Sequence, residues 1–126
     1  MQPEAIVALY RELQDYVGWQ SEDDRRMVEL GPIVAPSLAP LIDDFYREIE
    51  RHSAARQVIV GGAAQVERLK QTLVQWIREL FSGNYDDDYV HRRWRVGRRH
   101  VEIGLDQVFA NAALSRLRKG LLRAAR

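Results

Sequence analysis

A histidine has the side-chain type and surroundings that could do chemistry in this sequence. His100 lies in line with Val96 and Ile103 on one face of an expected helix. Gly97 precedes it by one turn and Gly104 follows it by one turn, so a flat ligand would have clearance beside the imidazole. Neutral imidazole is a common metal ligand. A lone histidine on an apolar face is nevertheless more often a hydrogen-bonded core residue, and spacing alone does not identify a cofactor.

A tyrosine is the second unusual residue. Tyr46 is in register with Ile42 and Ile49 on the expected buried side of its helix, where Leu or Phe is more usual. A buried phenol needs a hydrogen-bond partner, although its hydroxyl can also reach the rim of a core. A planar ligand between this helix and the following two would explain both the tyrosine and the histidine.

Other chemical groups offer less. His52 lies at an expected helix C-terminus, where imidazole caps carbonyl groups, and His91 lies among arginines on an expected solvated face. Residues 86–88 are three adjacent aspartates, but they lack the alternating spacing and later Glu of a calcium loop, so helix capping is favoured. We find no paired catalytic carboxylates, nucleophile elbow or phosphate loop, so we expect no enzyme.

The elements that position these residues are expected to be helices. Apolar residues recur at steps of three and four, and no alternating runs indicate strands. The predicted helices cover residues 4–17, 21–30, 37–51, 66–80 after a break at Gly61-Gly62, 86–103 and 106–126. Gly31-Pro32 is expected to end the second helix, and the third is expected to fray near residues 51–53. The chain is therefore predicted to be all-α.

Length and composition restrict the class of protein. The 126 residues suit one domain, here residues 1–126, and 46% apolar with 29% charged residues is a globular composition. No run approaches the roughly 18 apolar residues of a membrane span, and the N-terminus has no signal pattern, so we expect a cytoplasmic protein with no membrane partner. The absence of cysteine excludes disulfides and thiolate ligands.

Charge is distributed unevenly along the chain. Residues 1–90 carry nine Lys/Arg and sixteen Asp/Glu, for a net −7, whereas residues 91–126 carry ten and two, for +8. Such a basic end suits nucleic acid, an acidic partner or the chain's own acidic part. Seventeen of the nineteen cations are Arg, which favours carboxylates and phosphates that bind in a bidentate manner.

A long ordered string of residues resembles the haem domain of the globin-coupled sensors and protoglobins. It runs through Trp76-Ile77-x-x-Leu80-Phe81-Ser82-Gly83-x-Tyr85-Asp86-x-x-Tyr89, then Arg92-Arg93-x-x-Val96-Gly97-x-x-His100-Val101-x-Ile103-Gly104-Leu105. The resemblance is strong over residues 65–105 and weaker over residues 43–46. It implies an all-α, globin-like fold of the globin-coupled sensor type. Because that fold closes with two long antiparallel helices, the chain is expected to lack the final one.

The resemblance also implies roles for particular residues. The proximal haem ligand, and so the metal ligand, falls on His100, and the distal tyrosine that hydrogen-bonds to bound oxygen falls on Tyr46. Leu69 and Thr72 match distal positions of the following helix. The remaining residues implied to line the haem pocket are Phe45, Leu73, Val96, Gly97, Ile103 and Phe109. Glu102 and Ala110 depart from the family's usual basic and aromatic residues, which weakens the inference about proximal packing and signal relay.

The implied function is an oxygen-sensing domain. It would hold haem b, bind O₂ or another diatomic gas, dimerise through the last helix and pass the signal to an output module that this chain does not contain. The last helix carries an apolar stripe of Phe109, Ala113, Leu117 and Leu121, which we expect to face solvent unless another chain covers it.

Two alternatives stay open. A globin-like domain without haem could serve only for dimerisation and partner binding in stress signalling. A helical nucleic-acid binder could use the arginines of the fifth predicted helix, but these lie on several faces and suit haem propionates or acidic helices as well, so we expect no nucleic-acid partner. These arginines are Arg92, Arg93, Arg95, Arg98 and Arg99.

Overall fold

The protein is built from helices. The structure is a computed structural model that describes residues 2–57 and 59–126, and no strand occurs among them. Its elements are α1 (Pro3–Tyr16), α2 (Ser21–Val34), the 3₁₀ turn η1 (Ala35–Ser37), α3 (Leu38–Arg51), α4 (Ser53–Arg56), α5 (Gly62–Leu80), α6 (Asp87–Glu102) and α7 (Gln107–Ala124). The predicted all-α fold is confirmed. None of the described helices combines the length and apolar character needed to cross a bilayer.

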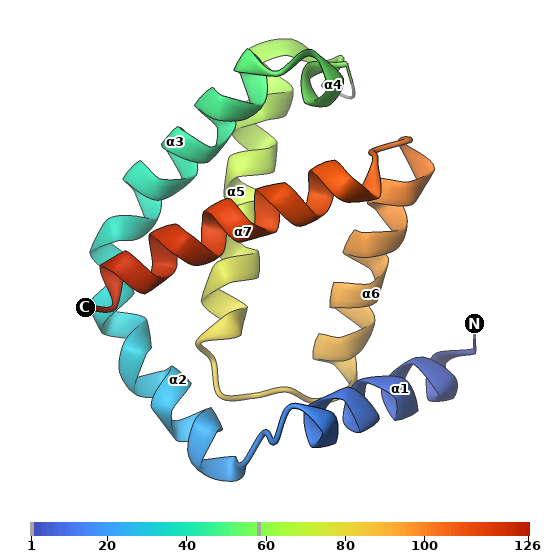
Figure 1. The fold of residues 1–126 in the computed structure, drawn as a ribbon, viewed down its shortest axis with the longest axis vertical. Coiled ribbons are helices and arrows are strands. Elements are labelled where there is room, and N and C mark those ends of the chain that lie inside the picture. The colour runs from blue at the N-terminus through green and yellow to red at the C-terminus, as the bar shows by residue number, and fades with distance from the viewer. Residues whose placement is uncertain (1, 58) are drawn as a thin grey trace.

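The helices form two packed groups (Figure 1). Helix α3 packs against α5 and α7, whereas α6 packs against α1. Helix α7 crosses the front of α5 in Figure 1, from the end of α6 towards the junction of α2 and α3. The helices that carry His100 and Tyr46 therefore have different main packing partners.

Two separate hydrophobic cores correspond to these groups. The first, which we call the α3–α5–α7 core, buries Leu38, Ile42, Phe45, Tyr46, Val66, Ile77 and Leu117. The second, the α1–α6 core, is smaller and buries Ile6, Tyr89 and Val90. In α3 the buried residues Leu38, Ile42 and Phe45 recur at steps of four and three, as an amphipathic helix requires. Burial of these faces is the main favourable contribution to folding.

Aspartate caps determine where α6 and α7 begin. The Oδ1 atom of Asp86 accepts a hydrogen bond from the backbone N–H of Tyr89 at 2.9 Å, and that of Asp106 accepts one from Val108 at 2.8 Å. Both bonds satisfy donors that the first turn of a helix leaves free. The predicted capping role of the aspartate run at 86–88 is confirmed at Asp86.

The predicted end of the second helix was wrong. Helix α2 continues through Pro32 to Val34. Proline removes one backbone hydrogen bond, which usually ends or kinks a helix. Val34, however, is only 1% exposed, and Gly31 lies against Phe81, so packing holds the chain helical beyond the proline. The short helix α4, in the region expected to fray, was also not predicted.

The expectation that the stripe of α7 faces solvent was wrong as well. Leu117 is 5% exposed and belongs to the α3–α5–α7 core, while Ala113 and Leu121 pack against that core. The cause is the position of α7 against α3, where the guanidinium of Arg116 also binds Asp44 at 2.9 Å. The large exposed apolar residues of α7 lie outside the predicted stripe and are Val108, Leu114 and Leu122.

Candidate functional site

Tyr46 lies in the α3–α5–α7 core. Its side chain is 8% exposed, and its ring meets that of Phe45 edge to face, with 5.2 Å between centroids. Leu69 and Leu73 of α5 pack against the same core. We find no hydrogen bond of the Tyr46 hydroxyl to another described residue. Burial raises the pKa of Tyr46 to about 12, so the phenol stays protonated and able to donate across the physiological range.

Thr72 lies one turn beyond Leu69 on α5. Its hydroxyl donates a hydrogen bond to the carbonyl of Arg68 at 3.1 Å, and the residue is exposed. A threonine in a helix commonly bonds to the preceding turn in this way. Thr72 is therefore on the exposed side of α5, whereas Leu69 and Leu73 pack against the core, and its hydroxyl is engaged within α5.

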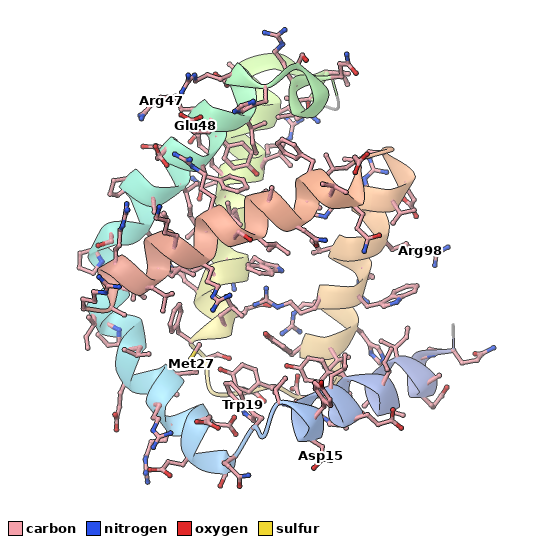
Figure 2. All side chains as sticks on the ribbon, viewed as in Figure 1. Asp15, Trp19, Met27, Arg47, Glu48 and Arg98 are labelled. Carbon is pink, nitrogen blue, oxygen red and sulfur yellow. The ribbon has the colours of Figure 1, made fainter. Side chains whose placement is uncertain are left out.

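A polar cavity adjoins Tyr46 and was not predicted. It measures about 320 Å³ and is lined by Asp43, Tyr46, Arg47, Glu50 and Lys70. The ammonium of Lys70 pairs with Asp43 at 3.1 Å and links α5 to α3. Figure 2 shows Arg47 extending from the outer side of α3. The acidic residues at steps of three and four around Tyr46 were the sequence signal for this polar edge of the core.

Phe109 lies beside Phe45 in a second, smaller hollow of about 180 Å³ between α3 and α7. Ile49, Ala112 and Ala113 also line this hollow, together with the polar residues Glu48, His52 and Arg116. The structure therefore brings together Phe45, Tyr46, Leu69, Leu73 and Phe109, all around α3.

His100 lies near the C-terminal end of α6, and its side chain is exposed. We find no hydrogen bond or ion pair of its ring with another described residue. Partial burial lowers the pKa of His100 below its usual value of 6.5, which favours the neutral imidazole. A neutral, accessible imidazole is the form that binds a metal.

The surroundings of His100 are open. A Cβ added at Gly97, one turn before it, would meet no atom within 4 Å. Arg98, the next residue, points away from the other helices (Figure 2). Val96 is half-buried and Ile103 is 36% exposed. A flat group could therefore approach α6 at Gly97 without displacing a neighbour.

Gly104 follows the end of the helix that carries His100. Helix α6 ends at Glu102, and Gly104 adopts a φ of +76° beyond it. This left-handed conformation is typical of a glycine that ends a helix. Gly104 therefore does not extend the helical face of His100. Neither His100 nor its neighbours Val96, Gly97 and Ile103 are among the residues packed into either core.

Arg93 is the residue of this region whose importance sequence reasoning missed. Its guanidinium carbon lies 3.9 Å from the ring centroid of Trp76 and 4.7 Å from that of Tyr89. Its Nη2 donates to the carbonyl of Trp76 at 2.5 Å, whereas Nε and Nη1 are buried without a partner among the described residues. Burial lowers the pKa of Arg93 below its usual value. The available signal was its spacing of four and seven residues from Gly97 and His100.

The donor set limits what the site can hold. No three His, Asp or Glu side chains gather into a metal-binding group within residues 2–57 and 59–126. A metal held by several protein ligands is thus not supported there. One free imidazole, open space at Gly97 and an apolar core with a protonated phenol do fit a planar metal complex that needs one protein ligand, as haem does.

Comparisons with known proteins agree with this fit. Residues 8–126 match the family model described as Protoglobin. The chain is 30% identical over 103 residues to the "Heme-based aerotactic transducer HemAT" of Halobacterium salinarum, a match covering 79% of this chain and 21% of that protein. It thus spans about a fifth of that relative's length.

A solved structure extends the likeness to the fold. The globin domain of a Geobacter sulfurreducens globin-coupled sensor superimposes with a TM-score of 0.83 at 26% sequence identity. The match covers 90% of this chain and 74% of that domain. The predicted globin-like fold of the globin-coupled sensor type is confirmed.

Proposed function

The chain belongs to the protoglobin family, and from this we propose that it is a haem-based oxygen-sensing domain with His100 as the protein ligand to haem b. The aerotactic relative of Halobacterium salinarum, which its name describes as haem-based, supports the cofactor and the sensory role. When bound, the haem iron supplies the reversible binding of a diatomic gas.

His100 would hold the iron through a ring nitrogen. Its lowered pKa keeps the imidazole neutral, and its ring has no competing partner among the described residues. Gly97 leaves the adjacent turn of α6 open. Val96 and Ile103 would line the same side of the pocket, whereas Phe109 lies beside Phe45 at α3.

Tyr46 would donate a hydrogen bond to the bound gas. Its raised pKa keeps the proton on the phenol, and a bond from phenol to polarised oxygen is charge-assisted. Phe45, Leu69 and Leu73 would exclude water around it, because they pack in the same core. Thr72 would offer a second hydroxyl only after giving up its bond to Arg68.

The signal would leave through the end of α6. A shift of His100 moves α6, and α7 follows after a short connection that contains Gly104. We propose that α7 passes the shift to a second copy of the chain and then to an output module. The exposed residues Val108, Leu114 and Leu122 offer apolar contact area for such a homodimer.

One observation carries the proposal: an exposed imidazole on α6, without a partner among the described residues, occurs together with a buried phenol on α3. The test is the rate at which oxygen leaves reduced, haem-loaded protein, measured by stopped-flow absorbance. A charge-assisted hydrogen bond of about 1.5–3 kcal/mol predicts that Tyr46→Phe accelerates release roughly 10- to 150-fold.

Tyr16→Phe is the control, because Tyr16 is 87% exposed on α1 and its variant should release oxygen at the unaltered rate. Haem-loaded protein that takes up no oxygen after reduction would overturn the proposed function. An unchanged rate in Tyr46→Phe would remove Tyr46 from it.

A further inference from the structure

The relative position of His100 and Tyr46 depends on how the two cores are joined. Tyr46 is buried in the α3–α5–α7 core, and α6 packs mainly on α1. Helices α5 and α6 make few contacts with each other and are not one of the closely packed helix pairs. A small number of side chains must therefore fix the angle between α5 and α6.

Arg93 is a partly buried side chain that spans the two cores. It stacks on Trp76, which packs against the α3–α5–α7 core, and on Tyr89, which is buried in the α1–α6 core. Its Nη2 also donates to the backbone carbonyl of Trp76. The planar guanidinium can stack and donate in its own plane at once, which a lysine ammonium cannot do.

The neighbouring link is weaker. Arg92 pairs with Glu79 of α5 at 3.3 Å, but the Arg92 side chain is 43% exposed. Exposed ion pairs contribute little and are screened by salt. Arg92 therefore offers a matched comparison, since it joins the same two helices from solvent.

Helical geometry connects Arg93 to His100. Residues seven apart lie two turns from each other on the same face, so the Cα atoms of Arg93 and His100 are separated by about 10 Å along α6. Gly97 lies between them on that face. Rotation or tilt of α6 about the Arg93 contact would therefore displace His100.

Arg93 uses only part of its hydrogen-bonding capacity in this position. Its Nε and Nη1 atoms are buried without a hydrogen-bond partner among the described residues, and buried polar groups usually have one. From these contacts we propose that Arg93 is a positioning residue, which orients α6 on α5 and so places His100 relative to Tyr46. The part that concerns His100 rests on the proposed function.

The test measures the distance between the two helices before any haem is added. The chain has no cysteine, so cysteines introduced at the exposed positions Gln71 on α5 and Val101 on α6 take spin labels at those sites alone. Pulsed electron paramagnetic resonance then gives the distance distribution. We expect Arg93→Met to shift or broaden it, with a smaller change in Arg93→Lys, and Arg92→Met to leave it unaltered.

Circular dichroism verifies that each variant is folded. If Arg93→Met does not fold, the distance distribution of Arg93→Lys tests the proposal in its place. Distributions of the Arg93 variants that superimpose on that of the unaltered chain would overturn the proposal. The distance result is independent of the proposed function, because it needs no haem.

The link to His100 is tested in haem-loaded, reduced protein by the iron–histidine stretching band in resonance Raman spectra. The band should shift in Arg93→Met and not in Arg92→Met. A changed helix distance with an unchanged band would confine Arg93 to helix packing and overturn its role for His100. Failure of the chain to bind haem would reject the proposed function and, with it, the role of Arg93 in placing His100. The distances between the spin labels would still decide whether Arg93 orients α6 on α5.

Discussion

Replacement of Tyr46 by Phe should make the protein less sensitive to alkaline pH. Burial raises the pKa of Tyr46 from 10.0 to about 12, because the charged phenolate would lose its hydration in the core. The unfolded chain therefore loses this proton at lower pH than the folded chain does. The contribution of Tyr46 to stability is complete below pH 10 and is lost as the pH rises towards 12.

The size of the effect follows from the shift. A pH of 11 lies one unit above the pKa of tyrosine in the unfolded chain and one unit below the pKa of Tyr46 in the folded chain. At this pH, Tyr46 has lost about 1.4 kcal/mol of its contribution to the free energy of unfolding. Urea unfolding, followed by circular dichroism at pH 8 and pH 11, measures this loss. The decrease in unfolding free energy between the two pH values should be about 1.4 kcal/mol smaller in Tyr46→Phe than in the unaltered chain.

Tyr89 serves as a second site and Tyr16 as the control. Burial also raises the pKa of Tyr89 to about 12, so Tyr89→Phe should reduce the alkaline loss by a similar amount. Tyr16→Phe alters an exposed residue and should follow the pH dependence of the unaltered chain. Equal losses in Tyr46→Phe and the unaltered chain would refute the burial of this phenol.

Three further outcomes concern packing, capping and surface charge, each measured as urea-unfolding free energy at neutral pH. Leu117→Ala should lower the unfolding free energy by about 2–5 kcal/mol, because the side chain is only 5% exposed. Leu122→Ala on the same helix should lower it far less, because Leu122 is 54% exposed in the unaltered chain. Equal losses in the two variants would contradict the docking of α7. Asp86→Ala should cost about 1 kcal/mol through loss of the α6 cap, and no change would exclude that cap. Arg116→Met should cost below about 1 kcal/mol, since its bond to Asp44 is half-exposed, and a larger cost that persists in high salt would contradict this estimate.

The sequence predicted the helices well where local signals agree with packing. Helix α5 has a regular apolar stripe, and α6 begins at the capping residue Asp86. The stripe of α3 also indicated burial of Phe45 and Tyr46. These features depend on residues that are close together in the sequence, so the spacing of apolar residues predicts them directly.

The errors occurred where distant contacts decide. Helix α2 continues past Pro32 because Gly31 lies against Phe81, which is far away in the sequence. The apolar face of α7 was expected to need another chain, yet Leu117 finds its cover in the α3–α5–α7 core. No local pattern reveals which helix a stripe will contact.

The site was predicted in part. The residues around Tyr46 are brought together by α3, α5 and α7, whereas His100 lies outside both cores. Arg93 escaped notice because a sequence does not reveal which of several arginines will lie over aromatic rings. The roles of these residues towards haem remain predictions.

The central claim is that His100 ligates haem. Its most direct test is a titration of the purified chain with haem, followed by the Soret absorption band of the reduced protein. The unaltered chain and the His52→Ala variant should bind one haem and give the band of a histidine-ligated iron, and His100→Ala should lose that band. A His100→Ala variant with the spectrum and affinity of the unaltered chain would contradict the account.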